Sequence, residues 1–119
     1  MSAGNIDRES DIHLHVGLDK DNNPISLSWT ADEGEMEPRR EVKAMMLTLW
    51  DMKENNTMRI DLWNKDFMVE EMRTMVYQNL LSLADVLQRA TQDEEAAEEM
   101  RRFGGRLAEL LELTGGSKS

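Results

Sequence analysis

Three side chains near the N-terminus are the strongest candidates for chemistry in this sequence. Asp11, His13 and His15 stand two residues apart, so a β-strand would place all three on one face. Carboxylate and imidazole groups are suitable ligands for Zn²⁺ or Fe²⁺. However, successive positions on one face lie about 6.5–7 Å apart along a strand, which makes three ligands from a single strand awkward. The pattern therefore favours a solvated outer face, with a metal site as the alternative.

Other patterns that support catalysis are missing from the sequence. The paired carboxylates Glu70–Glu71 and Glu94–Glu95 fall on the charged faces of expected helices. The sequence contains no phosphate-binding loop, no nucleophile elbow and no HExxH zinc motif. The absence of cysteine excludes disulfides, thiol nucleophiles and thiolate metal sites. We therefore expect a protein that is not an enzyme and that requires no cofactor.

The composition restricts the partners that the chain can bind. Its 119 residues include 14 Lys+Arg and 24 Asp+Glu, which gives a net charge of -10 at pH 7 and disfavours nucleic acid and anionic membranes. There is no run of about 18–20 apolar residues, so direct insertion into a membrane is not expected. The N-terminal residues lack the basic and apolar regions of a secretory signal. We therefore expect a cytoplasmic protein.

The length of the chain predicts one domain. Residues 1–10 are small and polar, and we expect this N-terminal segment to be disordered. A single domain is expected over residues 11–114, followed by a mobile C-terminal tail at 115–119.

Strict alternation of apolar and polar residues predicts three strands. It covers residues 12–18 and 25–30, and the intervening residues 19–24 are rich in turn formers. The two segments together predict a β-hairpin over 11–30. A third alternating segment at 58–63 predicts another strand.

The segment 42–52 supports two interpretations. Val42, Met45, Met46 and Leu49 have helical spacing and follow Pro38, which suits the first turn of a helix. This favours a helix. In the alternative, residues 45–51 pair with the strand at 58–63 and form a second hairpin.

Two helices are expected in the C-terminal half. Over 68–90 most apolar side chains fall within about 140° of a helical wheel, and a last amphipathic helix is expected near 93–113. Asp66 is the expected N-cap of the first, and Thr91 or Asp93 that of the second. The predicted fold class is α+β: a small antiparallel sheet covered on one face by helices, in the order ββαβαα, or alternatively ββββαα with a second hairpin.

Three apolar residues lie away from the main stripes and are candidates for partner binding. Tyr77 and Leu81 stand on the opposite side of the long helix from its apolar stripe, and Leu47 is off the face of its expected helix. Such residues need cover from the last helix, from another subunit or from a partner. The chain also contains 10 Met, a residue that fills irregular cores and also forms adaptable binding surfaces.

Several stretches together resemble the GldC family of gliding motility-associated proteins. They occur in order along residues 11–112: Val16-Gly17-Leu18-Asp19, Lys43-Ala44-Met45-Met46-Leu47, Leu49-Trp50-Asp51, Thr57-Met58-Arg59-Ile60-Asp61-Leu62-Trp63-Asn64-Lys65-Asp66 and Arg89-Ala90-Thr91-Gln92-Asp93. The resemblance implies an accessory role in gliding or in the linked protein secretion, and a cytoplasmic location. It implies no catalytic residues.

The leading hypothesis is therefore a non-enzymatic interaction protein of gliding or secretion that binds a protein partner through an acidic, Met-rich helical surface. A chaperone-like role is its mechanistic form. One alternative is a metal-binding domain or metalloenzyme that uses Asp11, His13 and His15. The other alternative is a structural homo-oligomer.

Overall fold

The computed structural model describes residues 4–32 and 39–113, and these divide into two compact units between Phe67 and Met68. Each unit is described by itself. The expected mobile tail at 115–119 lies outside the described residues, as do the first three residues of the expected disordered segment and the helix start expected at Pro38.

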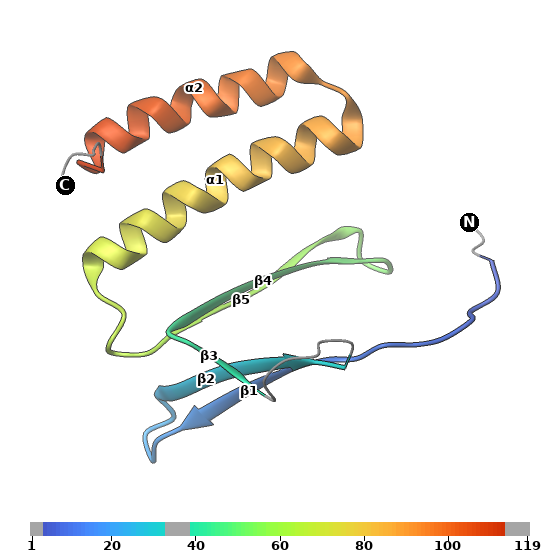
Figure 1. Cartoon of the computed structure of the whole chain (residues 1–119), viewed down its shortest axis with the longest axis vertical. Coiled ribbons are helices and arrows are strands. Elements are labelled where there is room, and N and C mark those ends of the chain that lie inside the picture. The colour runs from blue at the N-terminus through green and yellow to red at the C-terminus, as the bar shows by residue number, and fades with distance from the viewer. Residues whose placement is uncertain (1–3, 33–38, 114–119) are drawn as a thin grey trace. The chain divides into compact units, whose positions relative to one another are not determined.

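The first unit begins with the β-hairpin that the sequence predicts. Strand β1 (Ile12–Leu18) pairs antiparallel with β2 (Pro24–Ala31), and the short strand β3 (Arg40–Val42) pairs with the other edge of β2 (Figure 1). Asp19 shapes the turn between β1 and β2. Its Oδ1 accepts hydrogen bonds from the backbone N–H groups of Asp21 and Asn23, at 2.8 and 2.9 Å.

The second sheet corrects the helix expected over 42–52. This segment forms β4 (Ala44–Asp51), which pairs antiparallel with β5 (Asn56–Trp63), so the second-hairpin alternative is the one observed. The helical spacing is misleading because cross-strand pairing decides the structure. Pairing with β5 creates one continuous apolar face, which consists of Met45, Leu47, Leu49, Met58, Ile60 and Leu62.

Asp51 closes the β4–β5 hairpin. Its Oδ2 accepts hydrogen bonds from the backbone N–H groups of Lys53 and Glu54, at 3.1 and 2.6 Å. Asn55 adopts a left-handed conformation with φ 57°, which Asn tolerates well, and its N–H donates to the Asp51 carbonyl at 2.8 Å. The turn is therefore held by a local hydrogen-bond network.

The two sheets of the first unit meet near β3 and the end of β5. The backbone N–H of Asn64 donates to the carbonyl of Lys43 at 3.0 Å, and strand β2 contacts β5. Leu27 and Ser28 of β2 are buried, as is Asn64. The core of this unit is therefore small and lies around the middle of β2.

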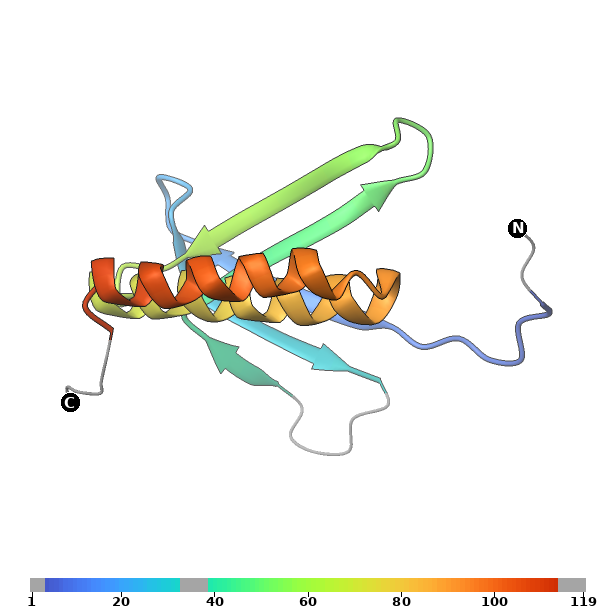
Figure 2. The same cartoon turned by 90° about the horizontal axis from the view of Figure 1, so that it is seen from above.

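The second unit is an antiparallel helix pair, α1 (Val69–Thr91) and α2 (Glu94–Leu110), whose members run alongside each other in Figures 1 and 2. The N-cap of α1 is Met68, which corrects the expected Asp66; the Met68 N–H donates to Glu71 Oε1 at 2.8 Å. Asp93 caps α2, as the sequence suggests, because its Oδ1 accepts from the Ala96 N–H at 3.0 Å.

The observed fold is α+β, with two antiparallel sheets followed by two helices. The order is closer to ββββαα than to ββαβαα, with β3 as an additional strand. In the described part of the chain, neither helix carries an apolar stretch long enough to cross a bilayer.

Candidate functional site

Small residues lie at the contact between the two helices. Ala84 of α1 and Ala97 and Gly104 of α2 are buried. A Cβ atom at Gly104 would lie only 3.0 Å from Leu81 Cδ2 and 3.9 Å from Tyr77 Cε1. The helices therefore approach closely because these positions carry almost no side chain.

This contact shows where Tyr77 and Leu81 lie. Both side chains are half-buried on the face of α1 that packs against Gly104. Of the three kinds of cover considered for them, the last helix is the one that the structure provides. Leu47 is half-buried on the apolar face of β4, opposite Ile60. Partner binding by these three residues stays a prediction.

A different set of apolar residues on the helix pair is exposed. On a helical wheel, four apolar residues of α1 lie on the side away from Tyr77 and Leu81. Two apolar residues of α2 lie on the same side of the helix pair. We call these six residues the helical apolar face: Val69, Val76, Leu83, Val86, Phe103 and Leu110, which are between 43% and 65% exposed. Large exposed apolar patches mark interaction sites in proteins.

The first unit also displays apolar side chains that the sequence pattern did not single out. Trp50 and Met52 stand at the tip of the β4–β5 hairpin and are 66% and 89% exposed. The Asp51 hydrogen bonds hold this tip in a defined turn. In the sequence, the signal for this exposed tip is a pair of large apolar residues, Trp50 and Met52, on either side of the turn-forming Asp51.

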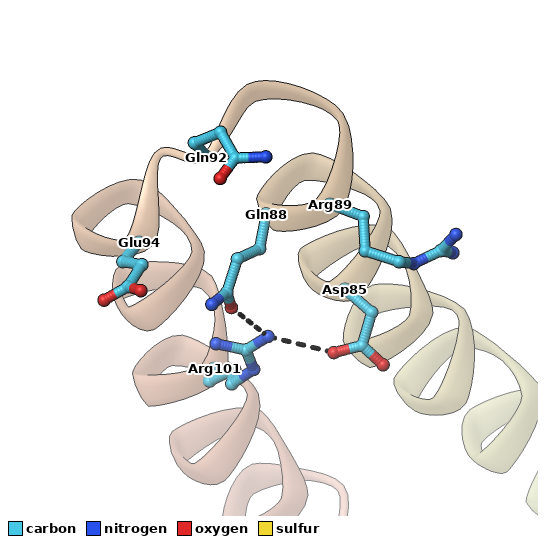
Figure 3. A pocket seen from close by; sticks show the side chains of 6 residues that line it. All are labelled: Asp85, Gln88, Arg89, Gln92, Glu94 and Arg101. Carbon is cyan, nitrogen blue, oxygen red and sulfur yellow. Dashed lines mark hydrogen bonds and ion pairs between the residues drawn. The ribbon is translucent and has the colours of Figure 1, made fainter.

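A polar cluster spans the helix pair near the α1–α2 turn (Figure 3). Arg101 of α2 donates to Asp85 at 2.9 Å and to Gln88 at 2.8 Å, and it also pairs with Glu98 at 2.8 Å. The pKa of Arg101 is raised, first by the hydrogen bond to Asp85 and then by that to Glu98. A hollow of about 600 Å³ at this point is lined by Asp85, Gln88, Arg89, Gln92, Glu94 and Arg101.

The interactions of Arg101 indicate that this polar cluster stabilises the helix pair. The guanidinium group of Arg101 already has two carboxylate partners, Asp85 of α1 and Glu98 of α2. It therefore links α1 to α2 beyond the close contact at Gly104.

The candidate metal ligands are brought together only in part. Asp11, His13 and Asp32 each offer a ligand atom, and these atoms all lie within 4.8 Å of one another. The third residue predicted from the sequence, His15, stacks on His13 with ring centroids 6.2 Å apart but is not in this group. Asp32 was missed because it directly follows the neighbouring strand β2 and is far from Asp11 in the sequence. Counting the hairpin register outward from the turn could have found it.

The comparisons with known proteins point to one family. No curated protein and no solved structure matches the chain. A family model described as gliding motility-associated protein GldC-like matches residues 24–113, which include β2 to β5 and both helices. The chain thus belongs to the GldC-like family of gliding motility-associated proteins.

Proposed function

We propose that this protein is a non-enzymatic accessory of gliding motility, or of the protein secretion linked to it, and that it acts in the cytoplasm by binding a protein partner. Family membership supports the link to gliding. The single observation that supports binding is the helical apolar face, whose six residues are exposed although each is large and apolar.

The size of this face predicts reversible binding. Full burial of one such side chain contributes about 1.5–3 kcal/mol, so burying the exposed half of six gives on the order of 5–9 kcal/mol. Association itself costs an estimated 4–15 kcal/mol, which is of similar size. The apolar face therefore needs a second source of affinity or acts on a partner that it releases easily. Transient binding of this kind suits a chaperone-like role.

Charge supplies that second source. The chain carries a net charge of -10, and the first two turns of α2 contain Glu94, Glu95, Glu98 and Glu99. A negative surface raises the rate of association with a basic partner and disfavours acidic ones. Met72, Met75 and Met100 are half-buried beside the apolar face, and flexible Met side chains adapt to varied partners. The partner that fits best is a basic, partly apolar protein segment.

The test is the double variant Val76→Ser with Leu83→Ser, introduced into gliding cells in place of the native protein. We expect it to retain its helix content and unfolding midpoint and to lose gliding and cross-linking to its partner. Leu18→Ser is the matched control, because Leu18 is 51% exposed and Leu83 is 57% exposed, but Leu18 lies on β1. Normal gliding with an unchanged set of cross-links in the double variant would contradict the proposal. A lowered unfolding midpoint would assign the face to internal packing.

A second copy of the chain is the alternative partner. Within the described residues, β4 and β5 pair with each other and with no further strand, and two-stranded sheets are marginally stable alone. Pairing of such an edge with the same edge of another copy would form a symmetric dimer. Sedimentation of the purified protein over a range of concentrations distinguishes the two cases, since a monomer throughout excludes a stable dimer.

A further inference from the structure

At the end of the β1–β2 hairpin that is remote from the Asp19 turn, two carboxylates face each other across the strands. Ile12 pairs with Ala31, so Asp11 and Asp32 are the next opposed positions. The Asp32 N–H donates to the Asp11 carbonyl at 3.0 Å, and the Asp11 N–H donates to Asp32 Oδ2 at 3.3 Å. These hydrogen bonds therefore hold the backbone of both residues in place, so that the two side chains begin from defined positions.

His13 completes a group of three possible ligands. It stands two residues from Asp11 and therefore on the same face of β1. Its Nε2 atom lies 3.9 Å from Asp32 Oδ1. The third ligand thus comes from the residue that follows β2, which removes the difficulty of placing three ligands on one strand.

We propose that Asp11, His13 and Asp32 bind one divalent transition-metal ion, such as Zn²⁺, with water completing its coordination. Ligands at about 2.0–2.2 Å in tetrahedral geometry lie roughly 3.3–3.6 Å from one another. The three ligand atoms are within 4.8 Å of one another before any ion binds. All three side chains are exposed. The Asp32 Oδ2 atom accepts from the Asp11 N–H, and small rotations of the Asp11 and His13 side chains close the remaining distance.

The charges favour a cation at this point. Like charges directly opposite each other across an antiparallel pair are destabilising, and Asp11 and Asp32 are such a pair. One imidazole with two carboxylates is a donor set for Zn²⁺, Fe²⁺ or Mn²⁺. A bound ion would turn a repulsive pair into a bridge that joins the beginning of β1 to the end of β2.

The test uses isothermal titration of ZnCl₂ into protein whose affinity tag has been removed, in a buffer that does not chelate metal. We expect one ion per chain. Asp32→Asn and His13→Ala should each weaken binding by at least the roughly 10–100-fold that loss of an outer-shell partner costs in metal sites. His15→Ala is the control, because it removes the neighbouring imidazole, which is half-buried and outside the group of three ligand atoms, and we expect unchanged affinity.

Nuclear magnetic resonance of the imidazole groups provides a second readout. Addition of ZnCl₂ should shift the ring signals of His13 much more than those of His15. Circular dichroism of each variant confirms that its secondary structure is retained. The proposal is overturned if the native protein binds no Zn²⁺ at millimolar concentration, or if Asp32→Asn binds as tightly as the native protein. A loss of affinity in His15→Ala equal to that in His13→Ala would also overturn it.

Discussion

Two adjacent glycines of α2 allow a sharp test of the helix contact. Gly104 faces α1, where an added Cβ would lie 3.0 Å from Leu81 Cδ2 and 3.7 Å from Leu80 Cδ2. At Gly105 an added Cβ would meet no atom within 4 Å. Substitution of each glycine by alanine therefore makes the same chemical change in the same helix, with a neighbour present in one case and absent in the other.

The two substitutions are expected to change the unfolding free energy by different amounts. Alanine is favoured over glycine in a helix interior by about 0.8–1.0 kcal/mol, and Gly105→Ala should gain this in full. Carbon atoms prefer separations of about 3.5–4.0 Å, so Gly104→Ala must push Leu81 or the helices apart. Overpacking of this kind costs about 1–3 kcal/mol, which offsets or exceeds the helix gain. The two variants should therefore differ by about 1–3 kcal/mol in unfolding free energy.

Urea unfolding followed by far-ultraviolet circular dichroism measures this difference, because the signal reports on helix content. Gly105→Ala should raise the unfolding midpoint, and Gly104→Ala should leave it unchanged or lower it. Gly104→Val should lower it further, since its side chain is larger and β-branched. Equal stabilisation by both alanine variants would refute close packing of the helices at Gly104.

Two further predictions concern the turns. Asp93→Ala should destabilise α2 by about 1 kcal/mol through loss of its N-cap, whereas Asp66→Ala should not destabilise α1. Thermal unfolding compares the two variants, and an equal loss of stability would contradict the capping assignment. The pKa of Asp19 is lowered, first by the backbone hydrogen bond from Asn23, so its carboxylate stabilises the hairpin above about pH 4 and this contribution is lost as the pH falls. Asp19→Asn should flatten the dependence of stability on acidic pH, and an unaltered profile would argue against this role.

The sequence predicts an element well where one pattern dominates. The β1–β2 hairpin has strict alternation and a turn rich in Asp and Asn, so its prediction is confirmed. The apolar residues of 45–51 are compatible with a helical stripe and also with a strand. Pairing with β5 decides in favour of the strand. The three residues of β3 are too few for periodicity to reveal.

The candidate sites depend even more on contacts between elements. Asp11 and His13 were identified from their spacing, but Asp32 needs the strand register. The position of Tyr77 and Leu81 away from the apolar stripe indicated that something covers them, and the wheel could not say what. Gly104 identifies α2 as the element that covers them. A glycine within an amphipathic helix costs stability, so its presence indicates a position that another element approaches closely.

The two apolar sides of α1 differ in a way that separates their roles. The side toward α2 packs Tyr77, Leu80 and Leu81 against Gly104, so large side chains of α1 meet a position that carries no side chain. The opposite side carries Val69, Val76, Leu83 and Val86, which are exposed. A helix that only needed to pair with α2 would gain nothing from this second set and would be less soluble because of it. The pairing of α1 with α2 leaves this second side exposed, and this exposure supports the partner binding that we propose for it.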